Sequence, residues 1–246
     1  MMDISVELIP RDRETLLRDV AEVKACFPPA DMINIPDLLR FPLRSWDAAE
    51  LVRPHFPTVI PHIRAIDIAP GAPLPGADQP GLGAVLVVQG DPPSDLRHLT
   101  YPNTTESIIR RYRAEAPHLS VYAAFDPYRR APYAEMEAVA RKKEAGAAGF
   151  FTQPIFDMRM LELCMNWLHG ENVFWGISPV VGPRSRSYWE TTNHVIFPHD
   201  FEPTLEANIG FARQMMRAVR AQGGNVYLMP LRVNLQRYLT PLCDPG

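Results

Sequence analysis

Several acidic, amide and basic side chains stand inside or just after short apolar segments, where an enzyme commonly keeps its reactive groups. Glu7 lies in the segment ISVELI, between Val6 and Leu8. Because burial disfavours the charged form of a carboxyl group, we expect the pKa of Glu7 to be raised. A raised pKa suits a general acid near neutral pH, although a carboxylate paired at the rim of a fold would give the same pattern.

Asp91 offers a second carboxylate, because it directly follows the apolar segment at residues 84–90. It could belong to a reactive site, or it could cap the loop that begins with DPPSD. Gln89, Gln153 and Arg232 stand in or just past segments of the same kind. These polar side chains are therefore further candidates for the site.

The sequence disfavours both a catalytic metal and a serine nucleophile. His62 has no HExxH pattern, no second histidine at metal-ligand spacing and no Cys–His cluster beside it. A hydrogen-bonded core histidine is the simpler interpretation. Ser178, in GISPV, lacks the GxSxG turn that presents the nucleophile of a serine hydrolase.

Eight short apolar segments rich in β-branched or aromatic residues must position these groups. They cover residues 4–9, 32–35, 58–66, 84–90, 120–125, 149–155, 173–180 and 225–231. Most are apolar nearly throughout, which is typical of parallel strands covered on both faces. Amphipathic helical patterns separate them, except that residues 68–83 are too rich in Pro and Gly to form a regular helix.

The alternation of strand and helix predicts a parallel sheet with right-handed crossovers. Eight such units in 246 residues point to a (β/α)8 TIM barrel, with an irregular third helix, as a single domain over residues 1–246. A doubly wound open sheet would call for a glycine-rich turn after the first strand, and ELIPRDRE contains no glycine. In a barrel, the site is expected at the carboxyl ends of the strands.

The composition of the chain limits the classes of partner and the compartment that we expect for it. With 25 basic and 28 acidic side chains the net charge is -3, so no basic surface for nucleic acid is expected. Three widely spaced cysteines, an N-terminus without a signal-peptide pattern and the lack of a long apolar stretch favour a reduced cytoplasmic protein without a membrane span. The Met-rich segment FARQMMRAV and the apolar segment LQRYLTPL favour a homo-oligomer, with a dimer preferred.

Five motifs, collinear along the chain, resemble the methylenetetrahydrofolate reductase family. SVELIP is similar to the family's first strand, PHI at 61–63 to its Pro-His-Leu pattern, and QGDPP at 89–93 to its Arg-Gly-Asp-Leu-Pro turn. AGAAGFFTQPIFD at 145–157 resembles the signature Ala-Gly-Ala…Thr-Gln-Phe-Phe-Phe-Asp, and GISPV resembles Gly-Ile-Leu-Pro-Val. The resemblance implies a (β/α)8 flavoprotein of one-carbon metabolism that reduces 5,10-methylenetetrahydrofolate to 5-methyltetrahydrofolate.

The resemblance also implies roles for single residues. Glu7 would be the general acid that opens the methylene bridge, and Asp91 would stabilise the cationic iminium beside the pterin. Gln153 would hydrogen-bond the folate, and Trp189 would stack on substrate or nicotinamide. Arg232 would hold the glutamate tail of the folate, because a guanidinium group binds a carboxylate with two hydrogen bonds.

The cofactors implied by the resemblance are FAD and, as electron donor, NADH or NADPH. The matching flavin positions are His62, Gln89, Gly90, Asp91, Phe125, Arg129, Glu135 and Lys142. Three positions depart from the family pattern by substitution, since Gln89 replaces an arginine, Phe125 a tyrosine and Pro36 a threonine. The family's histidine after the fifth strand is also missing, although Arg129 and Arg130 could supply the charge that a pyrophosphate needs. A flavin-independent enzyme that takes hydride directly from NAD(P)H therefore stays open. So does a non-redox barrel that binds a pterin for methyl transfer or as an accessory protein.

Overall fold

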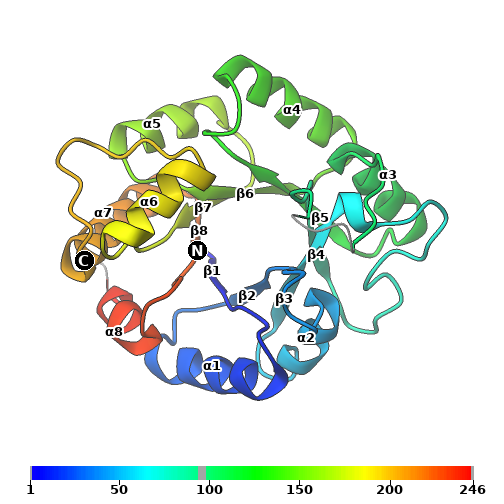
Figure 1. The fold of residues 1–246 in the computed structure, drawn as a ribbon, viewed down its shortest axis with the longest axis horizontal. Helices are drawn as coiled ribbons and strands as arrows, with labels where there is room; N and C mark the ends of the chain where they lie inside the picture. The colour runs from blue at the N-terminus through cyan, green and yellow to red at the C-terminus, as the bar shows by residue number, and fades with distance from the viewer. Residues whose placement is uncertain (1, 94–97, 245–246) are drawn as a thin grey trace.

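Eight parallel strands close into a barrel, as the alternating pattern predicts (Figure 1). The computed structural model of the protein describes residues 2–93 and 98–244. The strands are β1 (Ile4–Glu7), β2 (Met32–Ile35), β3 (Thr58–Arg64), β4 (Ala84–Val88), β5 (Ser120–Phe125), β6 (Gly149–Pro154), β7 (Val173–Ile177) and β8 (Asn225–Leu228). Each pairs in parallel with its neighbour in the chain, and β8 pairs with β1. The predicted (β/α)8 fold is confirmed.

Helices surround the barrel (Figure 1). They are α1 (Arg13–Cys26), α2 (Ser45–Val52), α3 (Thr105–Glu115), α4 (Pro132–Glu144), α5 (Met158–Trp167), α6 (Pro183–Thr192), α7 (Leu205–Ala221) and α8 (Leu235–Leu239). Between β3 and β4 there is only the 3-10 turn Ala65–Asp67 before a run of turns, which confirms the irregular third connection. Helix α6 was missed, because its polar sequence PRSRSYWETT has no continuous apolar stripe.

Side-chain hydrogen bonds fix the starts of α1, α3, α5 and α7. Asp12, Asp157 and Thr204 each accept a hydrogen bond from a backbone N–H in the first turn of α1, α5 and α7. Thr104 forms a reciprocal capping box with Ser107 at the start of α3. A cap of this kind contributes about 1 kcal/mol, and it fixes where the loop above each strand gives way to a helix.

Successive residues of each strand point alternately toward the helices and into the barrel. Outward side chains such as Val6, Ile33 and Val85 join the main hydrophobic cluster between sheet and helices. Inside the barrel, Phe151 stacks on Phe174 with ring centres 4.3 Å apart. This apolar layer leaves the polar inward positions of β1, β2, β3 and β8 to form a separate group.

Candidate functional site

Polar side chains from four strands form one hydrogen-bonded network in the barrel. The Ser5 hydroxyl donates to Oδ1 of Asn34 at 2.7 Å, and Nδ2 of Asn34 lies 3.1 Å from Nε2 of His62. The Tyr227 hydroxyl donates to the carboxylate of Glu7, and a side-chain hydrogen bond between Tyr227 and Asn34 joins the two pairs. The strand register explains the grouping, because β1 lies between β2 and β8 and pairs Ser5 with Tyr227 and Glu7 with Asn34.

Glu7 has the electrostatics of a general acid. Burial raises its pKa to about 7, and the hydrogen bond from Tyr227 opposes that rise. Burial and the neighbouring Glu7 carboxylate raise the pKa of Tyr227 well above its ordinary value, so the phenol keeps its proton. The expected rise of the Glu7 pKa is confirmed. A carboxyl group with a pKa near neutrality can both donate and recover a proton at physiological pH.

His62 is neutral, and the network selects its tautomer. Burial lowers its pKa to about 3. Because Ser5 donates to the amide oxygen of Asn34, the amide nitrogen of Asn34 donates to Nε2 of His62. The ring proton is therefore assigned to Nδ1. The sequence interpretation of a hydrogen-bonded histidine is confirmed, and His62 also lines a cavity.

This central cavity, of about 230 Å³, lies at the carboxyl ends of β2 to β6. It brings together eight of the residues selected from the sequence, namely His62, Gln89, Gly90, Asp91, Arg129, Glu135, Lys142 and Gln153. Basic and acidic side chains both line it, among them Arg64, Arg130, Asp37 and Asp126. The cavity is therefore suited to a polar ligand with hydrogen-bonding groups on several sides.

Glu135 and Lys142 form a buried ion cluster on the α4 side of the central cavity. Nζ of Lys142 lies 3.8 Å from Glu135 and donates to the carbonyl oxygen of Ala124 at 2.7 Å. Glu135 also pairs with Nε of Arg130 at 3.3 Å and accepts from the backbone N–H of Asp126. Burial raises the pKa of Glu135 and lowers that of Lys142. Both side chains thus have polar partners within the protein.

The turn after β4 has mainly a structural role. Gln89 donates through Nε2 to the carbonyl of Asn103 at 2.9 Å and accepts the backbone N–H of Thr105 at 3.1 Å, which fixes the start of α3. Gly90 has φ +81°, a conformation that disfavours any side chain. The Asp91 side chain is 84% exposed and pairs with Arg129 at 3.4 Å, so it is a carboxylate of the cavity rim.

A second cavity, of about 260 Å³, contains Glu7 and Arg232 together. We call it the side cavity; it lies at the ends of β1 and β8. Arg232 is exposed, and its guanidinium carbon lies 5.2 Å from the ring centre of Tyr188. The hydrogen-bonded network runs from Glu7 in the side cavity to His62 in the central cavity.

Two predicted site residues do not reach either cavity. Phe125 is fully buried in the main cluster between sheet and helices, because its neighbour Ala124 takes the inward position. A ring in that layer cannot contact a flavin at the barrel mouth, so that prediction is wrong. Trp189 is only 6% exposed and packs edge-on against Phe156 at 5.5 Å. It stabilises α6, and the predicted stacking on a ligand is not supported by its position.

The residues that sequence reasoning missed are Asn34, Tyr227 and Asp126. Asn34 and Tyr227 are inward polar groups of the mainly apolar strands MINI and NVYL. Their polarity inside such strands was the available signal. Burial raises the pKa of Asp126, whose carboxylate accepts the backbone N–H of Tyr128 at 3.0 Å. It follows β5 directly, and that position marks it as a candidate.

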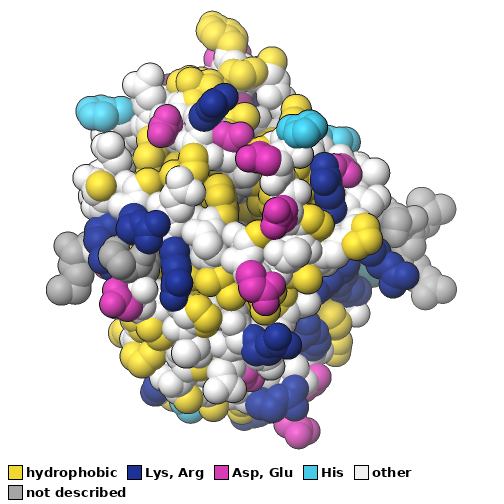
Figure 2. Space-filling view, turned by 90° about the vertical axis from the view of Figure 1, so that its left-hand side faces the viewer, with side chains coloured by type: hydrophobic (Ala, Val, Ile, Leu, Met, Phe, Trp, Pro, Cys, Tyr) yellow, Lys and Arg dark blue, Asp and Glu magenta, His cyan; other side chains and the backbone are white. Residues whose placement is uncertain are grey.

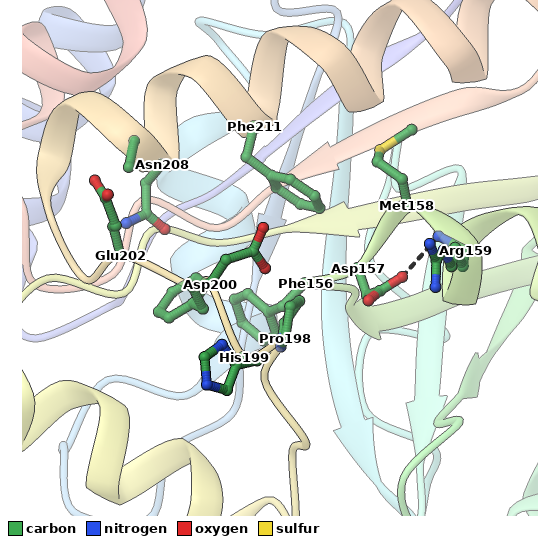
Figure 3. Close-up of a pocket in the computed structure, with 12 residues that line it drawn as sticks. Phe156, Asp157, Met158, Arg159, Pro198, His199, Asp200, Glu202, Asn208 and Phe211 are labelled. Atoms are coloured by element: carbon green, nitrogen blue, oxygen red, sulfur yellow. Dashed lines mark hydrogen bonds between the residues drawn. The ribbon is translucent and has the colours of Figure 1, made fainter.

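A third hollow, which we call the peripheral cleft, lies between the end of β6 and the start of α7. It measures about 610 Å³ and is lined by aromatic side chains and carboxylates (Figure 3). Figure 2 shows this side of the molecule, where apolar surface is bordered by acidic side chains. The segment FPHDFEP at residues 197–203 combines both side-chain types, but its sequence alone did not predict a cleft.

The side chains at the flavin positions do not fit a flavin as they are placed here. Phe125 faces away, and the polar groups of Gln89, Glu135 and Lys142 are bonded within the protein. FAD itself stays a prediction, and no chemical step is assigned to it.

Within residues 2–93 and 98–244, no group of three or more His, Cys, Asp or Glu side chains could hold a metal ion. In the same residues no helix combines the length and the apolar character that crossing a membrane requires.

The fold is shared with solved structures of low sequence identity. No protein-family model matches the chain, and a comparison with curated proteins finds no match. An uncharacterized protein from Clostridium thermocellum that binds two copies of 5-methyl-5,6,7,8-tetrahydrofolic acid superposes with a TM-score of 0.69 at 12% identity, over 99% of this chain and 94% of that one. A 2,3-dimethylmalate lyase of the PEP mutase/isocitrate lyase superfamily gives 0.55 at 15%, over 94% and 76%. An oxaloacetate acetylhydrolase gives 0.56 at 11%, over 94% and 75%. At these identities the likeness shows the fold, a (β/α)8 barrel.

Proposed function

We propose that the chain binds a reduced folate at the carboxyl rim of its barrel and reduces a 5,10-methylene bridge to a 5-methyl group. One observation carries the proposal, which is the Glu7 carboxyl group with a pKa of about 7, bonded to Tyr227 beside an open cavity. The fold neighbour from Clostridium thermocellum supports the ligand class, because it binds 5-methyl-5,6,7,8-tetrahydrofolic acid.

The acid has one defined task in this reaction. Protonated Glu7 gives its proton to the bridge nitrogen N10 as the bond from that nitrogen to the methylene carbon breaks. The carbon is left as a cationic iminium on N5, and hydride addition converts it to a methyl group. Glu7 then recovers a proton from solvent, which its pKa of about 7 allows.

The hydride comes directly from a reduced nicotinamide nucleotide in this proposal. NADH or NADPH gives up a hydride and becomes the oxidised nucleotide, so electrons and atoms balance without a flavin. The misfit of the flavin positions favours this route over the flavoprotein mechanism. The protein aligns donor and acceptor and keeps water from the iminium.

Other residues of the two cavities bind the substrate. Arg232 is exposed beside Glu7, where its guanidinium group suits a carboxylate of the folate tail. Gln153 lines the central cavity and offers its amide to the pterin. Asp91 lies on the rim of the central cavity, and in this proposal its negative charge attracts the cationic iminium, although Arg129 neutralises part of that charge.

The test is a reaction of the purified protein with 5,10-methylenetetrahydrofolate and NADH or NADPH. We expect the nucleotide to be oxidised in step with the appearance of 5-methyltetrahydrofolate, measured by absorbance and mass spectrometry. The visible spectrum should lack isoalloxazine bands. Isoalloxazine bands that bleach with NAD(P)H and recover with the folate would replace direct transfer by a flavoprotein mechanism.

A second candidate is a reduced-folate-binding barrel without redox activity. The ligand of the fold neighbour favours it, because that ligand already carries the 5-methyl group. Such a protein would bind 5-methyltetrahydrofolate in calorimetry and leave NADH and NADPH unoxidised. Binding and turnover measured on one preparation therefore separate the two candidates.

A further inference from the structure

The peripheral cleft has no part in the proposed reaction, yet it is larger than the central and side cavities. It begins where β6 ends, at Phe156 and Asp157, and continues under residues 198–202 to the first turns of α7. Figure 3 shows side chains from these three segments converging on one hollow. Its volume of about 610 Å³ falls within the range of small-molecule pockets, about 300–1,000 Å³.

Aromatic rings form rigid walls of the cleft. Phe156 is 3% exposed and lies in a packed cluster with Trp189, Val195 and Phe197. Phe201 packs on Phe197 with ring centres 4.3 Å apart, and it lines the cleft together with Phe156. Because Phe201 is held by this packing and is only partly buried, a flat ligand can stack on its exposed face with little reorganisation.

Phe211 provides the wall on the α7 side. Its side chain is half-buried and points into the hollow from the second turn of the helix (Figure 3). Asn208 fixes the same helix against the loop after β7, since it accepts the N–H of Val180 at 2.9 Å and donates to its carbonyl at 3.0 Å. The α7 wall of the cleft is therefore held in place.

Carboxylates stand among these rings. Asp200 lies between Phe156 and Phe211 in Figure 3, and Glu202 lines the same cleft. In the part of the chain that the structure describes, neither carboxylate has a side-chain hydrogen bond or an ion pair. A carboxylate only accepts hydrogen bonds, so each can bind N–H donors of a ligand.

The aromatic walls and the carboxylates of the cleft together suit one kind of ligand ring. The ligand must be flat, and it must carry neighbouring N–H donors along one edge, as the 2-aminopyrimidin-4-one edge of a pterin does. Its 2-amino group and ring N–H can donate two parallel hydrogen bonds to one carboxylate. A phosphate-rich ligand is disfavoured by Asp157, Asp200 and Glu202 at the cleft.

We propose that the peripheral cleft is a second pterin site, which binds the ring of another reduced folate by stacking and by donation to Asp200. The proposal rests on the proposed function for its ligand class. The anionic tail of that folate lies outside the carboxylates, on the side of Arg159. Arg159 lines the cleft, is exposed, and has no ion pair within the described residues.

The test counts binding sites by calorimetry with 5-methyltetrahydrofolate and, separately, with tail-free 6-methylpterin. We expect two equivalents of the folate on the unaltered protein. Asp200→Asn keeps the side-chain size and lies on the surface, so it should fold normally. It should weaken the second site by about ten-fold or more, as expected for a charge-assisted hydrogen bond. Phe211→Ala should weaken it through lost stacking.

Glu206→Gln is the matched control, because Glu206 is an exposed carboxylate in the first turn of α7 that does not line the cleft. It should leave both sites unchanged. One equivalent bound to the unaltered protein and to Asp200→Asn alike would overturn the second site and leave the proposed function standing. The second site would also be overturned if benzylamine displaced 6-methylpterin from the cleft as readily as the folate does. The cleft would then recognise charge alone.

Failure of the proposed function has a different signature. It would show as no NAD(P)H oxidation, whether or not two equivalents bind. A protein that binds neither the folate nor 6-methylpterin would refute both proposals together.

Discussion

The hydroxyl of Tyr227 on β8 donates a hydrogen bond to the carboxylate of Glu7 on β1, across the seam where the barrel closes. The phenol favours the charged form of the carboxyl group, whereas burial favours the neutral form. Burial is the larger effect, and the balance leaves a pKa of about 7. The proton affinity of the site therefore depends on how well the two strands are joined.

Glu7→Gln should lower turnover by about 100- to 10,000-fold, the usual contribution of a general acid. The amide fills the same space but cannot give up a proton, so the barrel should stay folded. Initial rates of NAD(P)H oxidation at saturating folate measure the effect. Asp19→Asn is the control, because Asp19 lines the same side cavity without joining the network. A Gln variant within two-fold of the natural rate would exclude Glu7 as the acid.

Tyr227→Phe should raise the pKa of Glu7 above about 7, because it removes the hydrogen bond that stabilises the carboxylate. Activity requires protonated Glu7, so the alkaline limb of the pH–rate profile should move to higher pH. Carbon NMR of labelled glutamate gives the pKa without any turnover. Tyr122→Phe changes another tyrosine of the barrel interior, which packs on Phe151, and should leave the profile in place. A profile that Tyr227→Phe leaves unchanged would contradict the coupling.

Glu7 and His62 should make the free energy of unfolding depend on pH in opposite directions. The pKa of His62 falls from 6.5 to about 3 on folding, so unfolding takes up a proton between these values and stability rises with pH there. The pKa of Glu7 rises from 4.5 to about 7, so between these values stability falls as pH rises. Between pH 4.5 and 6.5 the two contributions oppose each other.

Glu7→Gln should therefore reveal the pH dependence that His62 alone contributes to stability. Its free energy of unfolding should increase with pH between 4.5 and 6.5 more steeply than that of the natural protein, by up to about 1.4 kcal/mol per pH unit. Urea denaturation at several pH values measures both slopes. Equal slopes for the two proteins would mean that Glu7 titrates in the folded state as it does in the unfolded chain.

Gly90→Ala should destabilise the protein by about 1 kcal/mol or more, because φ is +81° and a Cβ would lie 3.2 Å from Arg64 and 3.1 Å from Ile66. Gly210→Ala is the matched control. Its Cβ would meet nothing within 4 Å, and a helix interior favours alanine by about 1 kcal/mol. Thermal denaturation should shift in opposite directions for the two variants. The same shift for both would refute the strain at Gly90.

The strands could be predicted because each is a short apolar run closed by turn residues. The segments at 32–35 and 120–125 match β2 and β5 residue for residue. Others were drawn too long, as at 4–9, because the apolar run continues past the last ladder hydrogen bond of β1. Helix α6 could not be predicted, because its helical form depends on packing Trp189 into a cluster formed by distant segments.

The site was harder to predict than the fold. A resemblance transfers a residue type to a position, but it does not fix the face of the strand, and a shift of one residue reverses that face. This explains why Phe125 was assigned to the barrel mouth although it packs outward. The bond between Glu7 and Tyr227 joins residues 220 positions apart, so only the closed barrel reveals it.

The distance along the chain between these two partners also has a consequence for biosynthesis. A nascent chain that has reached only α7 already contains the Glu7 carboxyl group, but not the phenol that tunes it. The hydrogen bond that adjusts the pKa of Glu7 therefore forms only after β8 has left the ribosome and paired with β1. A chain that ends before Asn225 would lack β8, so Glu7 would have no hydrogen bond from Tyr227 and β1 would have no partner strand on that side.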